Sequence, residues 1–147
     1  RPRVLMYVAV FTAIGLGLLT TLMMRDRLEL NVLHDRNPQF VILSDGSVRN
    51  GYTVKVLNMV PQRRVMDLSI DGLPGAIMAI EPSSQPDGTT FRLDIEPDQA
   101  QPVKIYVRQP KDKAEPGAAS FTFVISDKTL GETDSYKATF NAPENAP

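Results

Sequence analysis

Hydrophobic residues are distributed in two different ways along this chain. Residues 4–24 form an uninterrupted run of 21 residues without a charge, with two arginines before it and two after it. At 1.5 Å per residue a helix of this length measures about 31 Å, close to the hydrocarbon thickness of a bilayer. No polar stripe interrupts the run, so the pattern predicts a transmembrane helix with charged flanks over residues 1–27.

A cleaved signal peptide is the competing interpretation of this run. Signal peptides have a shorter apolar core and small residues at the cleavage site, whereas Met23, Met24 and Arg25 end this one. We therefore expect the helix to remain in the membrane. The arginines are balanced on the two sides, so charge alone does not give the orientation. The chain starts with Arg1 rather than Met, which indicates a piece of a longer polypeptide.

Small side chains recur every four residues within the apolar run, at Ala9, Ala13, Gly17 and Thr21. This spacing places them on one helix face, and such faces allow membrane helices to approach closely. Small residues are also common in membrane helices that make no such contact. Two interpretations stay open, namely ordinary composition and a surface that packs against other transmembrane helices of a parent protein or against a partner protein.

After residue 27, apolar and polar side chains alternate with a period of two. In residues 91–96, Phe91, Leu93 and Ile95 alternate with charged residues, which is typical of a half-buried strand. About nine such runs follow at a spacing near ten residues: 28–33, 39–43, 52–56, 65–70, 76–80, 91–96, 103–108, 119–126 and 136–140. Gly, Pro and Asp supply turns between them at 44–47, 71–75, 86–88 and 110–117.

This pattern predicts an all-β domain preceded by one N-terminal transmembrane α-helix. The domain is expected to be an immunoglobulin-like (Ig-like) antiparallel β-sandwich over residues 28–142. The chain has neither Cys nor Trp, so stability must come from apolar burial. The expected core combines Val, Ile and Leu of the alternating faces with Phe40, Phe91, Phe121, Phe123 and Phe140. Residues 143–147 are polar and rich in Pro, which predicts a disordered tail.

Composition excludes several classes of chemistry. Residues 28–147 contain 12 Lys and Arg and 16 Asp and Glu, a formal charge of −4 (12 − 16). A mildly acidic domain is not expected to bind nucleic acid, which rewards clustered basic residues. Because Cys is absent, the chain holds no disulfide, Cys-ligated zinc, iron–sulfur cluster or thiol nucleophile.

Histidine and methionine are the remaining candidates for metal or catalytic chemistry. The one histidine, His34, has only Asp35 beside it, so we expect an exposed loop residue near the membrane rather than part of a triad. Thioether sulfur suits Cu(I), but Met66 and Met78 fall on strand positions where Met fills a core. Met59, at the end of a strand, fits either interpretation. The sequence therefore predicts no catalytic, cofactor-binding or metal-binding residues.

Clusters of charge are interpreted as surface features. The acidic residues within 94–98 alternate on a face expected to be solvated, whereas paired-acid chemistry needs a cleft. Arg63 and Arg64, and likewise residues 111–113 (Lys-Asp-Lys), are expected to be turn and loop charges rather than a binding patch.

Two segments carry a resemblance to a known family. Residues 28–38 (LELNVLHDRNP) and 44–58 (SDGSVRNGYTVKVLN) are similar to the C-terminal region of the FixG/CcoG/RdxA proteins. The similarity covers the whole chain, although the later strands are less distinctive. Within these motifs, Asn50-Gly51 is interpreted as a turn pair with positive φ before a strand, and residues 35–38 as a loop.

The resemblance implies a location and a setting. Proteins of this family are polytopic inner-membrane proteins with cytoplasmic ferredoxin-type 4Fe-4S motifs and a C-terminal Ig-like domain. They are linked to assembly of the cbb-type cytochrome c oxidase and to reduction of its copper. The resemblance therefore implies a bacterial inner-membrane chain with its N-terminal side cytoplasmic and residues 28–142 periplasmic. Clusters and any cupric reductase activity are expected only in an upstream part, so this segment is not expected to be an enzyme.

Three hypotheses for function follow. The first is a periplasmic docking module that holds an oxidase-assembly partner through strand edges or loops. The second is a copper-binding domain that takes part in metal transfer through His34 and Met59. The third is a structural cap on the membrane part. Expected partners are the inner membrane and other transmembrane helices or an assembly partner, with no nucleic acid and no small-molecule substrate.

Overall fold

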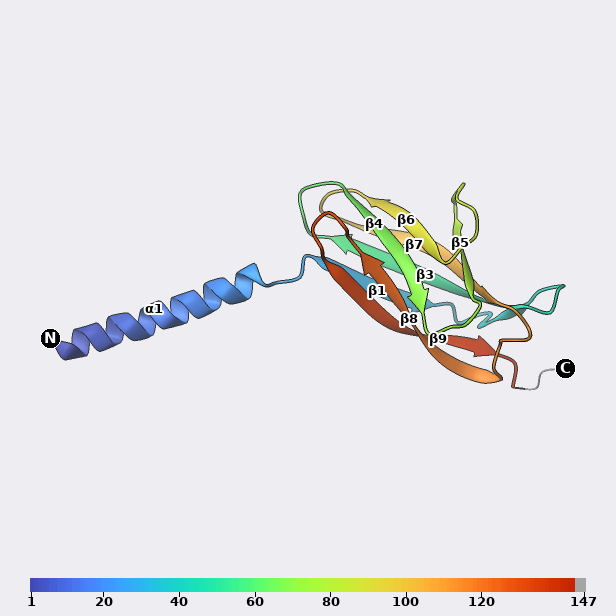
Figure 1. The fold of residues 1–147 in the computed structure, drawn as a ribbon, viewed down its shortest axis with the longest axis horizontal. Coiled ribbons are helices and arrows are strands. Elements are labelled where there is room, and N and C mark those ends of the chain that lie inside the picture. Colours follow the sequence, from blue (N-terminus) through green and yellow to red (C-terminus); the bar gives the residue numbers. More distant parts are fainter. Residues whose placement is uncertain (145–147) are drawn as a thin grey trace.

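A computed structural model describes residues 1–144 of the chain as one helix followed by a β-sandwich (Figure 1). Helix α1 spans Pro2–Met23. The strands are β1 (Leu28–His34), β2 (Val41–Ile42), β3 (Val48–Asn58), β4 (Arg64–Asp71), β5 (Ile77–Glu81), β6 (Thr90–Ile95), β7 (Gln99–Gln109), β8 (Gly117–Ser126) and β9 (Thr133–Ala142). Of the tail predicted over residues 143–147, residues 145–147 lie outside the described part.

Helix α1 extends away from one end of the sandwich and buries none of its side chains (Figure 1). Within residues 1–144 it is the one helix long and apolar enough to cross a membrane, with a mean hydropathy of 2.0. Its 22 residues give a length of about 33 Å, which matches the hydrocarbon core of a bilayer. Such a surface is stable in lipid or against other apolar helices, and not in water.

Two antiparallel sheets pack face to face. One sheet has the order β1-β3-β7-β5 with β2 beside β3, and the other has the order β6-β4-β8-β9. The period-two pattern positions the core: on β6, Phe91, Leu93 and Ile95 are buried while the residues between them are exposed. The predicted all-β sandwich with one preceding apolar helix is confirmed.

The core lies between the two sheets and contains four of the five phenylalanines expected there. Phe91, Phe121, Phe123 and Phe140 are buried, but Phe40 is only partly buried against the core. The reason is that the strand expected over residues 39–43 shortens to the two residues of β2. Met66 and Met78 are fully buried core residues, as their strand positions indicated.

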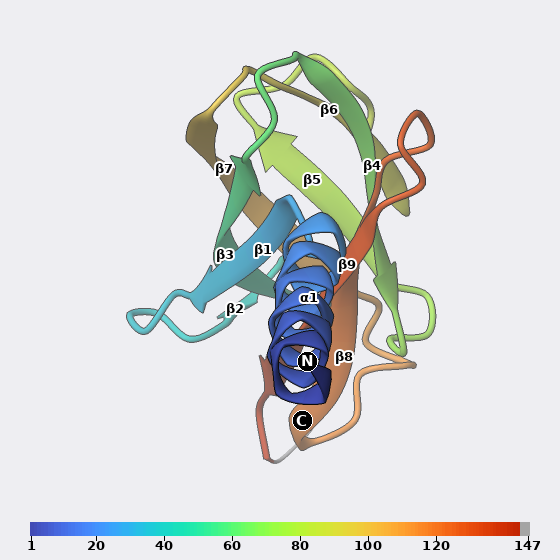
Figure 2. The ribbon, with the colours of Figure 1, turned by 90° about the vertical axis from the view of Figure 1, so that its left-hand side faces the viewer.

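The strand pairing gives the sandwich a defined end next to the helix. Leu28, at the start of β1, pairs with Asn58, at the end of β3. The β3–β4 connection (residues 59–63) and the β8–β9 connection (residues 127–132) lie at this same end, called the α1 end below (Figure 1). Figure 2 looks onto the molecule from this side. Residues 35–47 and the C-terminal end of β9 lie at the far end.

Candidate functional site

The motif residues of the first and third strands meet in one cluster, which we call the signature cluster: His34, Asp35, Asn50, Gly51 and Tyr52. Pairing of β1 with β3 sets His34 opposite Tyr52, and the two rings stack with centroids 4.7 Å apart and planes at 17°. The Nε2 atom of His34 lies 3.1 Å from Asn50 Oδ1. The signature cluster is therefore built around the stack of His34 on Tyr52, which the polar contact with Asn50 supports.

The prediction for His34 was wrong in three respects. It is the last residue of β1 rather than a loop residue, and it is half-buried. It also lies at the end of β1 away from α1, because β1 begins beside the helix at Leu28. The stack on Tyr52 explains the position, since the imidazole covers a buried ring that would otherwise face solvent.

Asn50 and Tyr52 join the two sheets. The Asn50 amide donates to the Asn141 carbonyl at 2.8 Å and accepts from the Asn141 N–H at 2.9 Å. The Tyr52 hydroxyl donates to the Thr139 carbonyl at 2.7 Å. Burial raises the pKa of Tyr52 above its ordinary value, so the phenol stays a neutral donor. These side chains satisfy backbone groups on the edge of β9, which is a structural role.

Gly51 was predicted to lie in a turn, and this prediction was wrong because β3 begins earlier, at Val48. The glycine is needed for space instead. A Cβ atom at Gly51 would overlap the carboxylate of Asp35, which crosses over β3 and forms an ion pair with Lys104 of β7. The Asp35 N–H also donates to the Gly51 carbonyl at 2.9 Å. The loop after β1 is therefore fastened to the outward face of its sheet.

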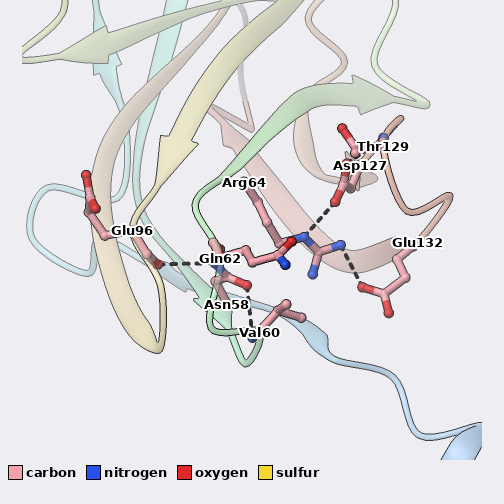
Figure 3. Close-up of polar contacts among 8 residues, drawn as sticks. All are labelled: Asn58, Val60, Gln62, Arg64, Glu96, Asp127, Thr129 and Glu132. Atoms are coloured by element: carbon pink, nitrogen blue, oxygen red, sulfur yellow. Dashed lines mark hydrogen bonds and ion pairs between the residues drawn. The ribbon is translucent and has the colours of Figure 1, made fainter.

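A second polar cluster lies at the α1 end and was not foreseen (Figure 3). Arg64, expected to be a turn charge, is only 4% exposed at the first position of β4. Its Nε donates to Asp127 Oδ2 at 2.6 Å and its Nη2 to Glu132 Oε2 at 2.6 Å. Within the described residues, its Nη1 atom is buried without a hydrogen-bond partner. We call Arg64, Asp127 and Glu132 the arginine network.

Asp127 is ionised in this network. Burial by itself raises the pKa of Asp127, but hydrogen bonds from the Thr129 N–H and from Arg64, with the arginine's charge, outweigh burial and hold the pKa below its ordinary value. Asn58 supports the neighbouring connection, since its side chain accepts from the Val60 N–H at 3.2 Å and donates to the Gln62 carbonyl at 2.8 Å (Figure 3). The β3–β4 and β8–β9 connections are thus held by internal contacts.

The other charged residues discussed above lie on the surface, as predicted from the sequence. Arg63 is 62% exposed and contacts Asp94 at 2.6 Å, and Glu96 is also exposed. Lys111, Asp112 and Lys113 are exposed between β7 and β8.

The pair considered for copper does not converge. His34 pairs with Tyr52, whereas Met59 follows Asn58 at the opposite end of β3. Met59 is seven residues beyond Tyr52, which is about 23 Å along an extended chain, so one ion cannot bind both side chains. Within residues 1–144 no group of three or more His, Asp or Glu is arranged to hold a metal ion.

The edge strands of both sheets are blocked at individual backbone groups. Besides the contacts to β9 described above, the blocking hydrogen bonds are Leu30 N–H to Asp134 Oδ2 (2.8 Å) on β1, the Gln85 amide to the Arg92 carbonyl (2.9 Å) on β6, and Met78 N–H to the Gly88 carbonyl (2.7 Å) on β5. Covered edges oppose the addition of a further strand.

The outward face of the β1-β3-β7-β5 sheet carries a groove of about 120 Å³ that is lined by one aromatic residue, two arginines and two acidic residues. The guanidinium of Arg49 lies 4.7 Å from the ring centroid of Tyr106, and Lys104 Nζ lies 5.6 Å from the same ring. We call this the Tyr106 groove, and it is lined by Leu43, Arg49, Ile77, Met78, Ala79, Glu81, Asp87, Tyr106 and Arg108. The outward positions of β8 in the other sheet are instead mainly Ser and Thr.

Sequence comparisons place this fold among known proteins. A family model described as "IG-like fold at C-terminal of FixG, putative oxidoreductase" matches residues 18–143. The chain is 49% identical over 143 residues to the nitrogen fixation protein FixG of Rhizobium meliloti, a match covering 97% of this chain and 27% of that protein. It is 29% identical over 145 residues to protein RdxB of Cereibacter sphaeroides, covering 99% and 30%. The chain thus spans less than a third of these relatives.

A solved structure has the same fold. The crystal structure of a FixG-related protein from Vibrio parahaemolyticus aligns with a TM-score of 0.66 at 23% identity, covering 80% of this chain and 97% of that one. The family match extends from the end of α1 through β9 and confirms the resemblance found in the motifs. This chain therefore belongs to the family of Ig-like domains found at the C-terminal end of FixG.

Proposed function

We propose that this chain is a membrane-anchored, non-catalytic docking module of a longer FixG-type inner-membrane protein that serves cbb-type cytochrome c oxidase assembly. The sandwich lies in the periplasm, and iron–sulfur clusters and copper reduction belong to an upstream part. Family membership and the apolar helix support this setting. The distinctive motif residues fit such a module, because they hold strands of the sandwich together.

The Tyr106 groove is the observation that carries the docking role. Tyrosine and arginine dominate the binding energy of protein interfaces, and rigid anchors bind at a lower entropic cost. Here Arg49 is already ordered over Tyr106, and the Asp35–Lys104 ion pair holds the neighbouring backbone. Individual backbone groups of the edge strands are already bonded, which favours an exposed sheet face over strand addition as the binding surface.

Photo-crosslinking from the groove tests this proposal. A photoreactive phenylalanine analogue replaces Ala79, which is half-buried in the groove, in the full-length parent protein in its membrane. The matched control places it at Val124, which is half-buried on the outward face of the other sheet. We expect a specific adduct with an oxidase-assembly protein from position 79 and none from position 124. Tyr106→Ala should abolish the adduct without unfolding the domain.

The outcome also separates the alternatives. Equal labelling from both positions, or no adduct from position 79, would contradict docking through this face. A purely structural cap predicts normal oxidase assembly after Tyr106→Ala, whereas the docking proposal predicts its loss. The copper alternative gains no support from geometry, because His34 and Met59 lie at opposite ends of paired strands.

A further inference from the structure

The β8–β9 connection at the α1 end is a rigid turn. The Asp127 N–H donates to the Glu132 carbonyl at 2.8 Å, and the Gly131 N–H donates to the Asp127 carbonyl at 2.9 Å. Asp127 Oδ1 accepts from the Thr129 N–H at 2.7 Å. Gly131 has φ +71°, a conformation that favours glycine. These contacts and the arginine network set the shape of the turn, and none of them involves the side chain of residue 130.

Leu130 at the tip of this turn is 52% exposed. Within residues 28–144, the exposed large hydrophobic residues are Leu33, Ile42, Met59, Val65, Leu130 and Tyr136. Met59 and Leu130 lie in the β3–β4 and β8–β9 connections at the α1 end, and Val65 lies next to them near the start of β4. Single exposed apolar residues are ordinary. Three of the six exposed residues, however, lie together at the end of the sandwich from which an apolar helix extends. Such a grouping indicates an apolar neighbour.

The linker keeps this end close to the helix. Only four residues separate Met23 of α1 from Leu28 of β1, so the Cα atoms of these two residues are at most about 18 Å apart. The Met59 N–H donates to the Arg27 carbonyl at 3.1 Å, which fastens the linker to the β3–β4 connection. The headgroup layer on one side of a bilayer is about 5–8 Å thick. If α1 fills the hydrocarbon core, the α1 end lies at the headgroups.

We propose that the α1 end docks on the surface of the bilayer that α1 enters, with Leu130 and Met59 inserted at the boundary between headgroups and acyl chains. This inference rests on the membrane anchoring in the proposed function. Lys128, two residues before Leu130, forms an ion pair with Asp67 at 3.0 Å, but its side chain is 81% exposed and so can also face a polar headgroup layer. Lipid is the occupant because the covalent linker brings these residues to the bilayer without a second protein. The contact limits the tilt of the sandwich and the orientation of the Tyr106 groove.

Single tryptophans test the contact, since the chain contains no Trp. The full chain carrying Leu130→Trp is reconstituted in phosphatidylcholine vesicles and in vesicles of the same lipid brominated on its acyl chains. The matched control is Ile42→Trp, because Ile42 is 51% exposed on β2 at the far end. Phe11→Trp in α1 reports the anchor itself. Bromine quenches only indole groups that reach the acyl chains.

We expect Leu130→Trp emission to fall at least about twofold in brominated vesicles, Phe11→Trp emission to fall further, and Ile42→Trp emission to stay unchanged. Quenching at Phe11 without quenching at Leu130 would overturn the surface contact and leave the anchor standing. An absence of quenching at both would overturn the anchor as well. A blue shift at Leu130 without quenching would place it against protein and refute lipid as the occupant.

Discussion

Replacing Asp127 by alanine should strongly destabilise the sandwich. The change removes the 2.6 Å pair with Arg64 and the hydrogen bond to the Thr129 N–H, while Arg64 stays buried with a side chain only 3% exposed. Losing one partner of a buried pair costs about 3–5 kcal/mol. Glu132 still contacts Arg64 and is 27% exposed, so we expect the lower end of that range, about 3 kcal/mol.

A double-mutant cycle identifies the cause of this loss. Arg64→Met leaves Asp127 buried without its cation, so it should also cost about 3 kcal/mol. The double variant buries no unpaired charge and should be more stable than either single variant, with a coupling energy of about 2 kcal/mol or more. Arg63→Met is the matched control, because Arg63 is 62% exposed and its loss should stay within about 0.5 kcal/mol.

Urea unfolding of residues 28–147, followed by circular dichroism, measures these differences. The domain is suited to isolation because α1 buries none of its side chains. A loss below about 1 kcal/mol for Asp127→Ala would refute the reasoning. Losses that simply add in the double variant would equally refute it, since they would show that the two residues act independently.

Two further predictions concern acid pH and the signature cluster. The pKa of Asp127 is lowered in the folded state, so its stabilising contribution is full above the unfolded value of about 3.9 and is lost as the pH falls through the folded pKa. Urea midpoints of the native chain and of Asp127→Asn should be measured from pH 6 to pH 2. The difference in stability between the two proteins should narrow below about pH 4, and a constant difference would contradict this prediction. Gly51→Ala should cost about 1–3 kcal/mol by displacing Asp35 from Lys104. Thermal unfolding should show that Asp35→Ala removes that penalty, and an equal penalty in both backgrounds would rule out the overlap as its cause.

Local patterns were sufficient for much of the architecture. The apolar run became α1, and the alternating runs became strands, because both periodicities depend only on neighbours within a few residues. The inward residues of β6 and the buried Met66 and Met78 follow directly from that alternation. The two motifs near residues 28–58 also indicated the family that the comparisons confirm.

Polar residues were harder to predict because their environment depends on distant partners. Arg64 and the exposed Arg63 are equivalent as sequence, yet only Arg64 faces Asp127 and Glu132, 63 and 68 residues further along. The combination Asp-x-Thr-x-Gly over residues 127–131 signals a turn, but not the arginine beneath it. His34 likewise resembled a loop residue until Tyr52 provided its stacking surface.

The sequence by itself determined the division between an apolar helix and a β-sandwich, the inward faces of the strands and the family. Only the tertiary structure decided that Arg64 is buried, that Gly51 makes room for Asp35, and that Leu130 is exposed at the α1 end of the sandwich. The physical reason is the separation along the sequence of the residues that determine each feature. Hydrophobic periodicity is a property of adjacent residues, whereas ion pairs, close approach and exposure depend on which strands the fold brings together.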